Sequence, residues 1–433
     1  MLQYTYMHVS VMKILDEEAK RPFWKKYHSF FHLAEIESSK TLQLFYLLLL
    51  SFFALSFTLL SNDPKLSRIA VETGNYTCSP FLPNCEGWYF LTALPHGYSQ
   101  GLLFALLFGV GILSVVASYH RRWEFAHASL LILFVVQTFF LIILAPHLLT
   151  NFYLYHLVLT LVFLLARNRL FFLQFTVVLS YFLAALVKFH DGWILGTYFT
   201  ALQTGLPLFP DTLTPILTVS ILLLELIGVW LLLKGGKGRI AILLLLLIFH
   251  LYSVILIGYP YPLIAIGALL LLFGNAEKAK CPVPQKGVVG WFIIFVLLGV
   301  NLLPIAVKGD EKHTLEGIVY AFYMFDANHQ CISRITIAND DGTETILVRG
   351  SGNAAVRCNP GSLLSEVKQV CRGNTVSNWT IDHSINGGPF YRVVDESSPC
   401  DLSYTYLRRN EWILLNPTKI GFPVENYYTY PRR

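Results

Sequence analysis

The chain has 433 residues, of which 55% are hydrophobic and 14% are charged, and its mean hydropathy is +0.54. These values exclude an ordinary soluble protein, which carries more charge and less apolar surface. The net charge of +5 does not indicate a nucleic-acid partner, because basic residues in a multi-span protein mainly report its orientation. We therefore predict an integral membrane protein that is surrounded by membrane lipid and does not bind nucleic acid.

The chain begins with a polar segment and continues with apolar runs. Residues 1–40 carry charges throughout and lack the apolar core of a cleavable signal peptide, so we predict a cytoplasmic amphipathic segment there. Nine apolar runs follow within residues 41–307, most of them near the roughly 20 residues that a spanning helix needs. They lie at 42–60, 101–119, 128–144, 152–165, 170–187, 213–233, 240–257, 261–273 and 288–307.

Clusters of lysine and arginine predict the orientation. They precede the first apolar run and follow the second, fourth, sixth and eighth runs, which places all of them on one side. The positive-inside rule makes that side the cytoplasm. The N-terminus then lies inside, the C-terminus lies outside, and Lys188 comes at the outer end of the fifth span.

The cysteines are distributed as this orientation requires. Six of the seven fall in predicted outside segments, and Cys281 falls in a predicted cytoplasmic loop. Cys78 and Cys85 share one outside loop and are predicted to pair, since disulfides form in oxidising compartments. The remaining four predict two further disulfides whose pairing the sequence leaves open: Cys331, Cys358, Cys371 and Cys400.

Residues 308–433 have the composition of a soluble domain. Segments 317–325, 331–340, 341–350 and 388–396 are predicted to be strands, with Asp341 and Gly342 at a hairpin turn, and 361–371 a helix with a serine cap. The predicted fold class is therefore a membrane all-α bundle of about nine transmembrane helices, N-in/C-out, followed by a small disulfide-bonded α+β extracytoplasmic domain. His329 and His383 in this domain lack the spacing of metal ligands, and no metal site is predicted.

Several polar side chains stand where hydrocarbon is expected, most of them toward the outer half of the membrane. They are Asn151 and His156 in the fourth run, Lys188 at the end of the fifth beside Asp191, Glu225 in the sixth and His250 in the seventh. Ionisable groups at membrane depth cost several kcal/mol, so they are candidates for function.

The residues alone leave two interpretations of each charge open. Lys188 either reaches the membrane interface with Asp191 as a surface partner, or serves as a base in an apolar pocket. His250 is either a functional group or a partner in an interhelical hydrogen bond. Glu225 has no cation nearby in sequence, so it is either protonated or paired with another span.

Residues 191–215 connect the fifth and sixth runs. This stretch is half apolar and rich in glycine and proline, too broken to span the membrane and too apolar for a free loop. It predicts a re-entrant or amphipathic lid in the membrane interface. A lid over a lysine would suit a lipid-soluble substrate.

The stretch VKFHDGWILG resembles the Lys-x-x-x-x-Trp-x-x-Gly motif of the vitamin K-dependent gamma-carboxylase family, also called the horizontally transferred transmembrane domain (HTTM) family. Lys188, Trp193 and Gly196 occupy the motif positions. NFYLYHLVLTLVFLL is similar to the family's Asn/His-x-Tyr-x-Tyr opening of the preceding span, and FHLYSVILIGYPYPLIAIGALLLLF resembles its Phe-His stretch before a proline-bearing span. The resemblance covers about residues 40–275 and not the C-terminal domain.

The resemblance implies a carboxylase of the carbon–carbon lyase type, coupled to hydroquinone epoxidation, that acts at the extracytoplasmic face. Reduced vitamin K or a related quinone would be the cofactor, carbon dioxide and oxygen the co-substrates, and an exported peptide or protein the substrate. Lys188 would be the base that deprotonates the quinone. The resemblance also implies catalytic roles for His250 and Asn151, and cofactor-binding roles for Trp193, His156, Tyr155 and Glu225.

Two departures from the family pattern keep other functions open. The family has a histidine where this chain has Asn151, and the family's large lumenal region has no counterpart in the short C-terminal domain. The alternatives are a non-carboxylating member that modifies a peptide or lipid, or a non-enzymatic membrane anchor for an interaction domain. The short domain favours a bacterial inner membrane with the domain in the periplasm; the alternative is the endoplasmic reticulum membrane with the domain in the lumen.

Overall fold

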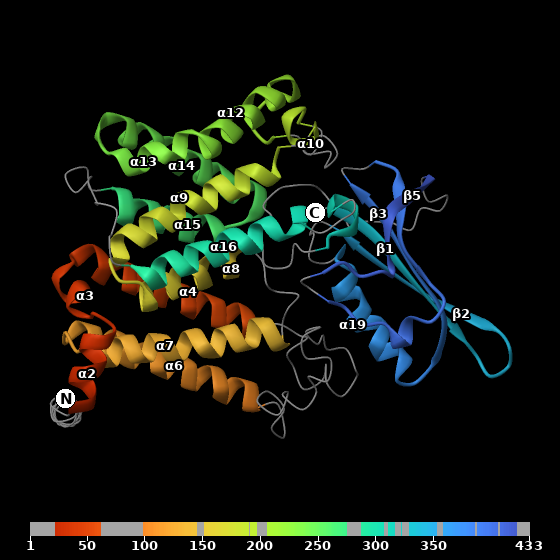
Figure 1. Ribbon diagram of the computed structural model, residues 1–433, viewed down its shortest axis with the longest axis horizontal. Coiled ribbons are helices and arrows are strands. Elements are labelled where there is room, and N and C mark those ends of the chain that lie inside the picture. Colours follow the sequence, from red (N-terminus) through yellow and green to blue (C-terminus); the bar gives the residue numbers. More distant parts are fainter. Residues whose placement is uncertain are drawn as a thin grey trace.

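A helical region and a sheet domain follow one another along the chain (Figure 1). The computed structural model describes residues 22–61, 98–144, 151–189, 191–196, 206–274, 287–306, 311–316, 322, 329–352, 358–385, 388–405 and 408–421. All structural statements below concern these residues. Cys78, Cys85, Cys281 and most of the predicted strand at 317–325 lie outside them.

The helical region contains all nine predicted apolar runs as helices. In chain order its elements are α2 (Pro22–Phe30), α3 (Ala34–Ser38), α4 (Lys40–Ser61), α6 (Tyr98–Tyr119), α7 (Trp123–Phe139) with the π-helical η4 (Phe140–Leu144), α8 (Asn151–Leu165), α9 (Arg169–Val187), α10 (Asp191–Ile194), η6 (Asp211–Leu213), α12 (Thr214–Leu226), η7 (Gly228–Trp230), α13 (Leu231–Lys234), α14 (Gly236–Ile257), α15 (Pro260–Phe273) and α16 (Val288–Ala306). The short α17 (Glu311–Thr314) follows before the sheet.

Fewer of these helices than the nine predicted have the dimensions of a full membrane span. Five described segments are long and apolar enough: Lys40–Ser61, Trp123–Ile142, Arg169–Val187, Asp211–Lys234 and Gly236–Leu256. Among the described residues, the apolar parts of the other four runs are shorter, at Phe104–Tyr119, Asn151–Leu165, Pro260–Phe273 and Val288–Leu303. At 1.5 Å per residue the 14 residues of α15 extend about 21 Å, whereas a hydrocarbon core is about 30 Å thick. The structure is thus compatible with an integral membrane protein, and the orientation stays a prediction.

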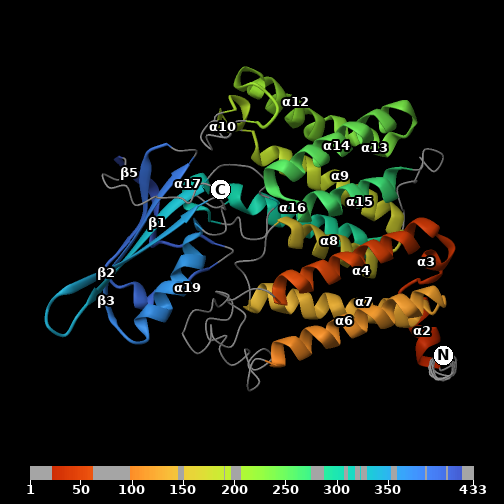
Figure 2. The ribbon, with the colours of Figure 1, turned by 180° about the vertical axis from the view of Figure 1, so that it is seen from behind.

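Helix α9 lies at the centre of the helical region, and α12 and α14 lie at its edge (Figure 2). In α9, 72% of the apolar window is buried, compared with 28% in each of the other two segments. Their exposed leucines and isoleucines need no protein partner if lipid surrounds them, because lipid tails are as apolar as leucine. Polar side chains on α9 are therefore enclosed by protein, while α12 and α14 also carry exposed apolar surface.

The C-terminal domain is one antiparallel sheet with the strand order β2-β1-β3-β4-β5. The strands are β1 (His329–Ala338), β2 (Glu344–Gly352), β3 (Thr375–Ile385), β4 (Phe390–Glu396) and β5 (Ile413–Gly421). Helix α19 (Pro360–Cys371) packs on one face, over a core that includes the fully buried Trp379. The two predicted disulfides are confirmed, and their pairing is Cys331–Cys358 and Cys371–Cys400.

Three predicted strands, the predicted hairpin turn and the predicted helix are confirmed, and the residue that caps the helix is corrected. The hairpin turns at Gly342, whose φ of +80° favours glycine. The helix is capped by Asn359, which accepts from the backbone N–H groups of Gly361 and Ser362, and not by a serine. The prediction missed β3 and β5. Serine, asparagine and aspartate in β3 favour turns, but β1 and β4 supply its backbone hydrogen bonds from both sides.

Two histidines of this domain form a hydrogen-bonded pair. The Nδ1 of His329 lies 3.0 Å from the Nε2 of His383, and both side chains are buried. The Nδ1 of His383 donates to the backbone oxygen of His313 at 2.5 Å. The pair therefore attaches α17, which follows the last membrane helix, to the centre of the sheet.

Candidate functional site

Lys188 is buried and paired with Glu225. It caps the C-terminal end of α9, its side chain is 1% exposed, and its Nζ lies 2.5 Å from Oε2 of Glu225, which is also 1% exposed. Lys188 is therefore buried and has a partner on α12, whereas its role as a base stays a prediction. The side chain of Asp191 lies outside the described ones. Glu225 likewise is the member of an interhelical pair.

Trp193 lies over the ammonium group of Lys188. The Nζ atom is 5.0 Å from the centre of the indole ring, a favourable distance for a cation–π contact. The indole Nε1 donates to the backbone oxygen of Thr218 at 2.9 Å, which fixes the ring against α12. Gly196 permits this arrangement, because its φ is +73° and a Cβ there would come within 2.7 Å of the Thr214 methyl group.

A second polar pair lies beside the first. The hydroxyl group of Tyr181 hydrogen-bonds Nε2 of His250, joining α9 to α14, as the interhelical interpretation of His250 expected. Glu225 lies within electrostatic range of Tyr181, and Lys188 lies within electrostatic range of His250. We call Lys188, Glu225, Tyr181, His250, Tyr155 and Tyr261 the buried polar cluster.

Three aromatic rings continue the cluster away from Lys188. Tyr261 contacts His250 and Tyr155, each with ring centres 5.8 Å apart. Phe322, from the segment between α17 and the sheet, packs on Tyr155 at 6.2 Å, and its backbone N–H donates to Oδ1 of Asn301 at 2.6 Å. Phe322 thus covers one side of the cluster.

The cluster contains two buried polar atoms without a hydrogen-bond partner among the described residues. They are the hydroxyl oxygen of Tyr155 and Nδ1 of His250. An unsatisfied buried polar group costs free energy, so such atoms commonly meet a water molecule or a ligand. Both atoms are therefore available to a bound polar group.

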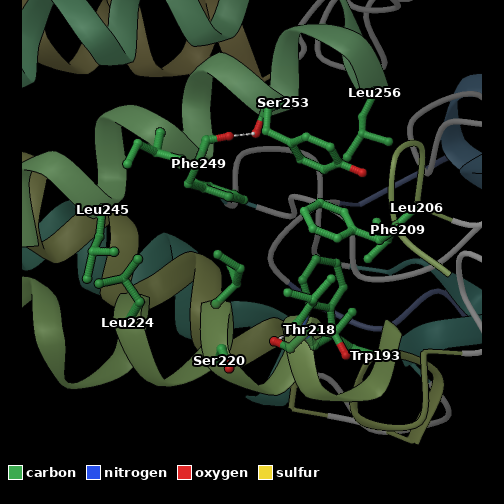
Figure 3. Close-up of a pocket in the computed structure, with 14 residues that line it drawn as sticks. Trp193, Leu206, Phe209, Thr218, Ser220, Leu224, Leu245, Phe249, Ser253 and Leu256 are labelled. Carbon is green, nitrogen blue, oxygen red and sulfur yellow. Dashed lines mark hydrogen bonds between the residues drawn. The ribbon is translucent and has the colours of Figure 1, made fainter. Parts of the chain in front are cut away.

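An apolar cavity of about 340 Å³ adjoins Lys188 through Trp193 (Figure 3). It lies between α12 and α14, with Trp193, Leu206 and Phe209 at one end and Leu224 and Leu245 at the other. Its wall is almost entirely apolar, and the helices that form it also carry exposed leucine and isoleucine side chains. Such a cavity suits a hydrocarbon chain that enters from the bilayer.

The predicted lid contributes to this cavity. Residues 191–196 and 206–215 are described, and the first part supplies Trp193 while the second supplies Leu206 and Phe209. The hydroxyl group of Tyr252 on α14 donates to the backbone oxygen of Pro207 at 2.7 Å. The described parts of 191–215 therefore pack against α12 and α14.

Two predicted site residues lie apart from the lysine. His156 is fully buried, but its Nε2 donates to the backbone oxygen of Leu49 at 3.3 Å and its ring packs on Phe53, so it faces α4. Asn151 is the half-buried first residue of α8, one turn before Tyr155. The structure brings together Lys188, Glu225, Trp193, His250 and Tyr155.

The sequence-based prediction missed Tyr181 and Tyr261. Both lie in apolar runs where a tyrosine resembles a packing aromatic residue, and neither was singled out. The available signal was spacing, because Tyr181 precedes Lys188 by seven residues and therefore shares its helix face. Comparisons with protein-family models, curated proteins and solved structures found no match to this chain. The family assignment consequently remains a prediction that rests on the motif residues.

Proposed function

We propose that the protein is a membrane enzyme that transfers a proton from a lipid-like molecule at the Lys188–Glu225 pair, as the resemblance to the gamma-carboxylase family implies. One observation carries this proposal. A lysine and a glutamate that are both buried make their pair beneath Trp193, and Trp193 also lines an apolar cavity. A proton-transferring group and a site for a hydrocarbon chain are thereby adjacent.

A buried charged pair is an unfavourable way to hold two helices together, because its desolvation costs free energy. Removing an ammonium and a carboxylate from water costs several kcal/mol per ion, and two leucines at these positions would hold the helices together without that cost. An amine and a carboxyl 2.5 Å apart can share one proton. When the shared proton lies on the carboxyl, the amine can accept a proton from a substrate hydroxyl group, and the ammonium that forms is balanced by the negative charge left on the substrate oxygen.

The described residues fit a quinone-like cofactor by two criteria. The apolar cavity beside Trp193 has the size of a small-molecule site and would hold an isoprenoid chain. The partnerless atoms of Tyr155 and His250 would bind polar groups of the ring. A reduced quinone, when bound, supplies an acidic hydroxyl group and the electrons for a reaction with oxygen.

Tyr181 and His250 have a positioning role in this proposal. Their hydrogen bond fixes the imidazole ring and occupies Nε2, so Nδ1 is left for a bound group. Lys188 acts as the base, and Glu225 and Trp193 hold its side chain at the cavity. Phe322 and Asn301 keep water from Tyr155 on the side of the sheet domain.

A non-carboxylating reaction at the same site is the second candidate. Asn151 stands where the carboxylase family has a histidine, and it lies one turn from Tyr155. The altered residue therefore shares a helix with one member of the cluster. In this candidate the same base acts on a lipid or on a lipid-linked group without capture of carbon dioxide.

The test compares small molecules that remain bound to three proteins extracted directly into lipid nanodiscs. These are the wild type, the double variant Lys188→Met/Glu225→Gln, and the control Lys234→Met, which alters an exposed lysine at the end of α13. The double variant removes both charges and keeps a similar side-chain volume, so we expect it to fold. Its melting curve verifies this. We expect mass spectrometry to find a quinone or isoprenoid lipid in the wild type and the control.

The double variant should lose most of this molecule. Turnover of reduced quinone with oxygen and carbon dioxide then separates the two candidates, because only a carboxylase consumes carbon dioxide. Equal retention of the molecule in all three proteins, or no specific lipid in the wild type, would overturn the proposal in favour of the membrane-anchor alternative.

A further inference from the structure

Helix α2 is attached to the helical region by one face. The ring of Trp24 packs on Phe125 with centres 4.5 Å apart, and the Tyr27 hydroxyl group donates to Nδ1 of His127 at 2.8 Å. Phe125 and His127 belong to the first turns of the candidate span Trp123–Ile142. Helix α2 therefore lies where a span begins, at the level of a membrane surface.

Hydrogen bonds from Arg169 hold the C-terminal end of α2. The guanidinium group of Arg169 donates to the backbone oxygen atoms of Phe31 at 2.5 Å and His32 at 3.2 Å. It also pairs with Glu35 at 3.2 Å. These bonds fix the rotation of α2 about its axis and determine which side chains point away from the helical region.

The outward side of α2 combines two aromatic side chains with one lysine. Phe23 is 64% exposed and Phe30 is 75% exposed, and residues seven apart lie on the same side of a helix. Lys26 follows Phe23 by three residues and projects beside it. Lys25 is also exposed, but at about 100° per residue it points about 160° away from Phe23. Within the described part of the chain, neither lysine forms an ion pair.

Acidic groups near α2 lie on its opposite side. His28 hydrogen-bonds Glu37 at 3.1 Å. A carboxylate oxygen of Glu124 lies within 4.8 Å of both side chains. At about 100° per residue, His28 and Lys26 point about 160° apart. The carboxylates therefore do not neutralise Lys26, and positive charge and exposed aromatic rings share one side.

We propose that α2 is an interfacial helix that binds anionic phospholipids. Phe23 and Phe30 insert among the acyl chains at the membrane surface, Lys26 binds the phosphate groups beside them, and Lys25 adds positive charge to the helix from its other side. This is the side-chain arrangement by which amphipathic helices bind anionic membranes. The helix lies at the end of the helical region away from the sheet domain (Figure 2), so this site is independent of the buried polar cluster.

The test measures amide hydrogen exchange of residues 22–30 in the full chain, reconstituted into nanodiscs of phosphatidylcholine alone or with phosphatidylglycerol. Two lysines near an anionic surface should slow exchange on the order of tenfold when phosphatidylglycerol is added. Lys25→Gln/Lys26→Gln should abolish this difference. The matched control Lys234→Gln/Lys237→Gln alters two exposed lysines at the same end of the helical region and should retain it (Figure 1).

Three outcomes overturn the proposal. One is equal exchange in both kinds of nanodisc for the wild type. Another is loss of the phosphatidylglycerol effect in the control pair as well as in the α2 pair, which would indicate a diffuse charge effect. The third is protection of α2 that depends on protein concentration and not on lipid, which would assign its outer side to a second copy of the chain. Phe23→Ser/Phe30→Ser tests the aromatic part separately and should weaken the lipid effect with both lysines present.

Discussion

The Nζ atom of Lys188 lies 2.5 Å from Oε2 of Glu225, although the two residues are 37 positions apart and belong to different helices. Each is 1% exposed, so neither charge is compensated by water. The pair consequently links the stability of the helical region to the chemistry proposed for it.

Glu225→Ala should destabilise the protein by about 3–5 kcal/mol, because it leaves the Lys188 ammonium buried without a partner. Lys188→Met/Glu225→Gln should retain most of the stability, since it removes both charges and preserves volume. Unfolding in mixed micelles with increasing dodecyl sulfate measures the difference. An unchanged midpoint for Glu225→Ala would show that water reaches the lysine and that the pair is not isolated.

Tyr181→Phe should reduce stability by about 1 kcal/mol and weaken retention of the bound molecule, because it removes the hydrogen bond that orients His250. Tyr261→Phe is the matched control, since the structure records ring contacts for Tyr261 and these are preserved. Melting curves and mass spectrometry of bound lipid provide the two readouts. Equal effects of the two substitutions would contradict the positioning role of Tyr181.

Ionisation of Glu316 should reduce the stability of the sheet domain as the pH rises. Burial raises the pKa of Glu316 above its ordinary 4.5, although hydrogen bonds from Asn410 oppose the effect. The folded chain keeps this proton at pH values where the unfolded chain has lost it, so ionisation of Glu316 opposes folding as the pH rises through its raised pKa.

Glu316→Gln stays neutral and keeps an oxygen acceptor for Asn410. Its unfolding midpoint should rise relative to the wild type as the pH increases from about 4 to about 7. Fluorescence of Trp379 and Trp412 can follow the melting of the domain in the full chain. The exposed Glu411→Gln serves as the control, and a constant difference between Glu316→Gln and the wild type would refute the assignment.

The two disulfides should differ in their access to reductant. Cys331 and Cys358 are each 1% exposed, whereas Cys371 and Cys400 are half-buried. Mild reduction followed by alkylation and mass spectrometry should therefore label the second pair first. Loss of either bridge should cost about 3 kcal/mol, because each closes a loop of nearly 30 residues. Simultaneous labelling would indicate that the domain opens as a whole before either disulfide reacts.

Local patterns predicted the elements well. Each of the nine apolar runs is a helix, and β1, β2, β4 and α19 lie where propensity and turn chemistry indicated. The count of full-length spans was too high, because hydropathy detects apolar character more readily than length. The missed β3 is the central strand of its sheet. Its polar residues have low strand propensity, so local propensity does not predict a strand there.

The sequence by itself determined a chain of apolar helices typical of a membrane protein, followed by a C-terminal domain with two disulfides, and it identified Lys188, Glu225 and His250 as polar groups in apolar runs. Composition and periodicity are local properties, so they are readable residue by residue. Only the tertiary structure decided that Lys188 pairs with Glu225, that Tyr181 bonds His250 and that His156 faces α4 instead. Those outcomes depend on which helix faces meet, and packing across the whole helical region determines them.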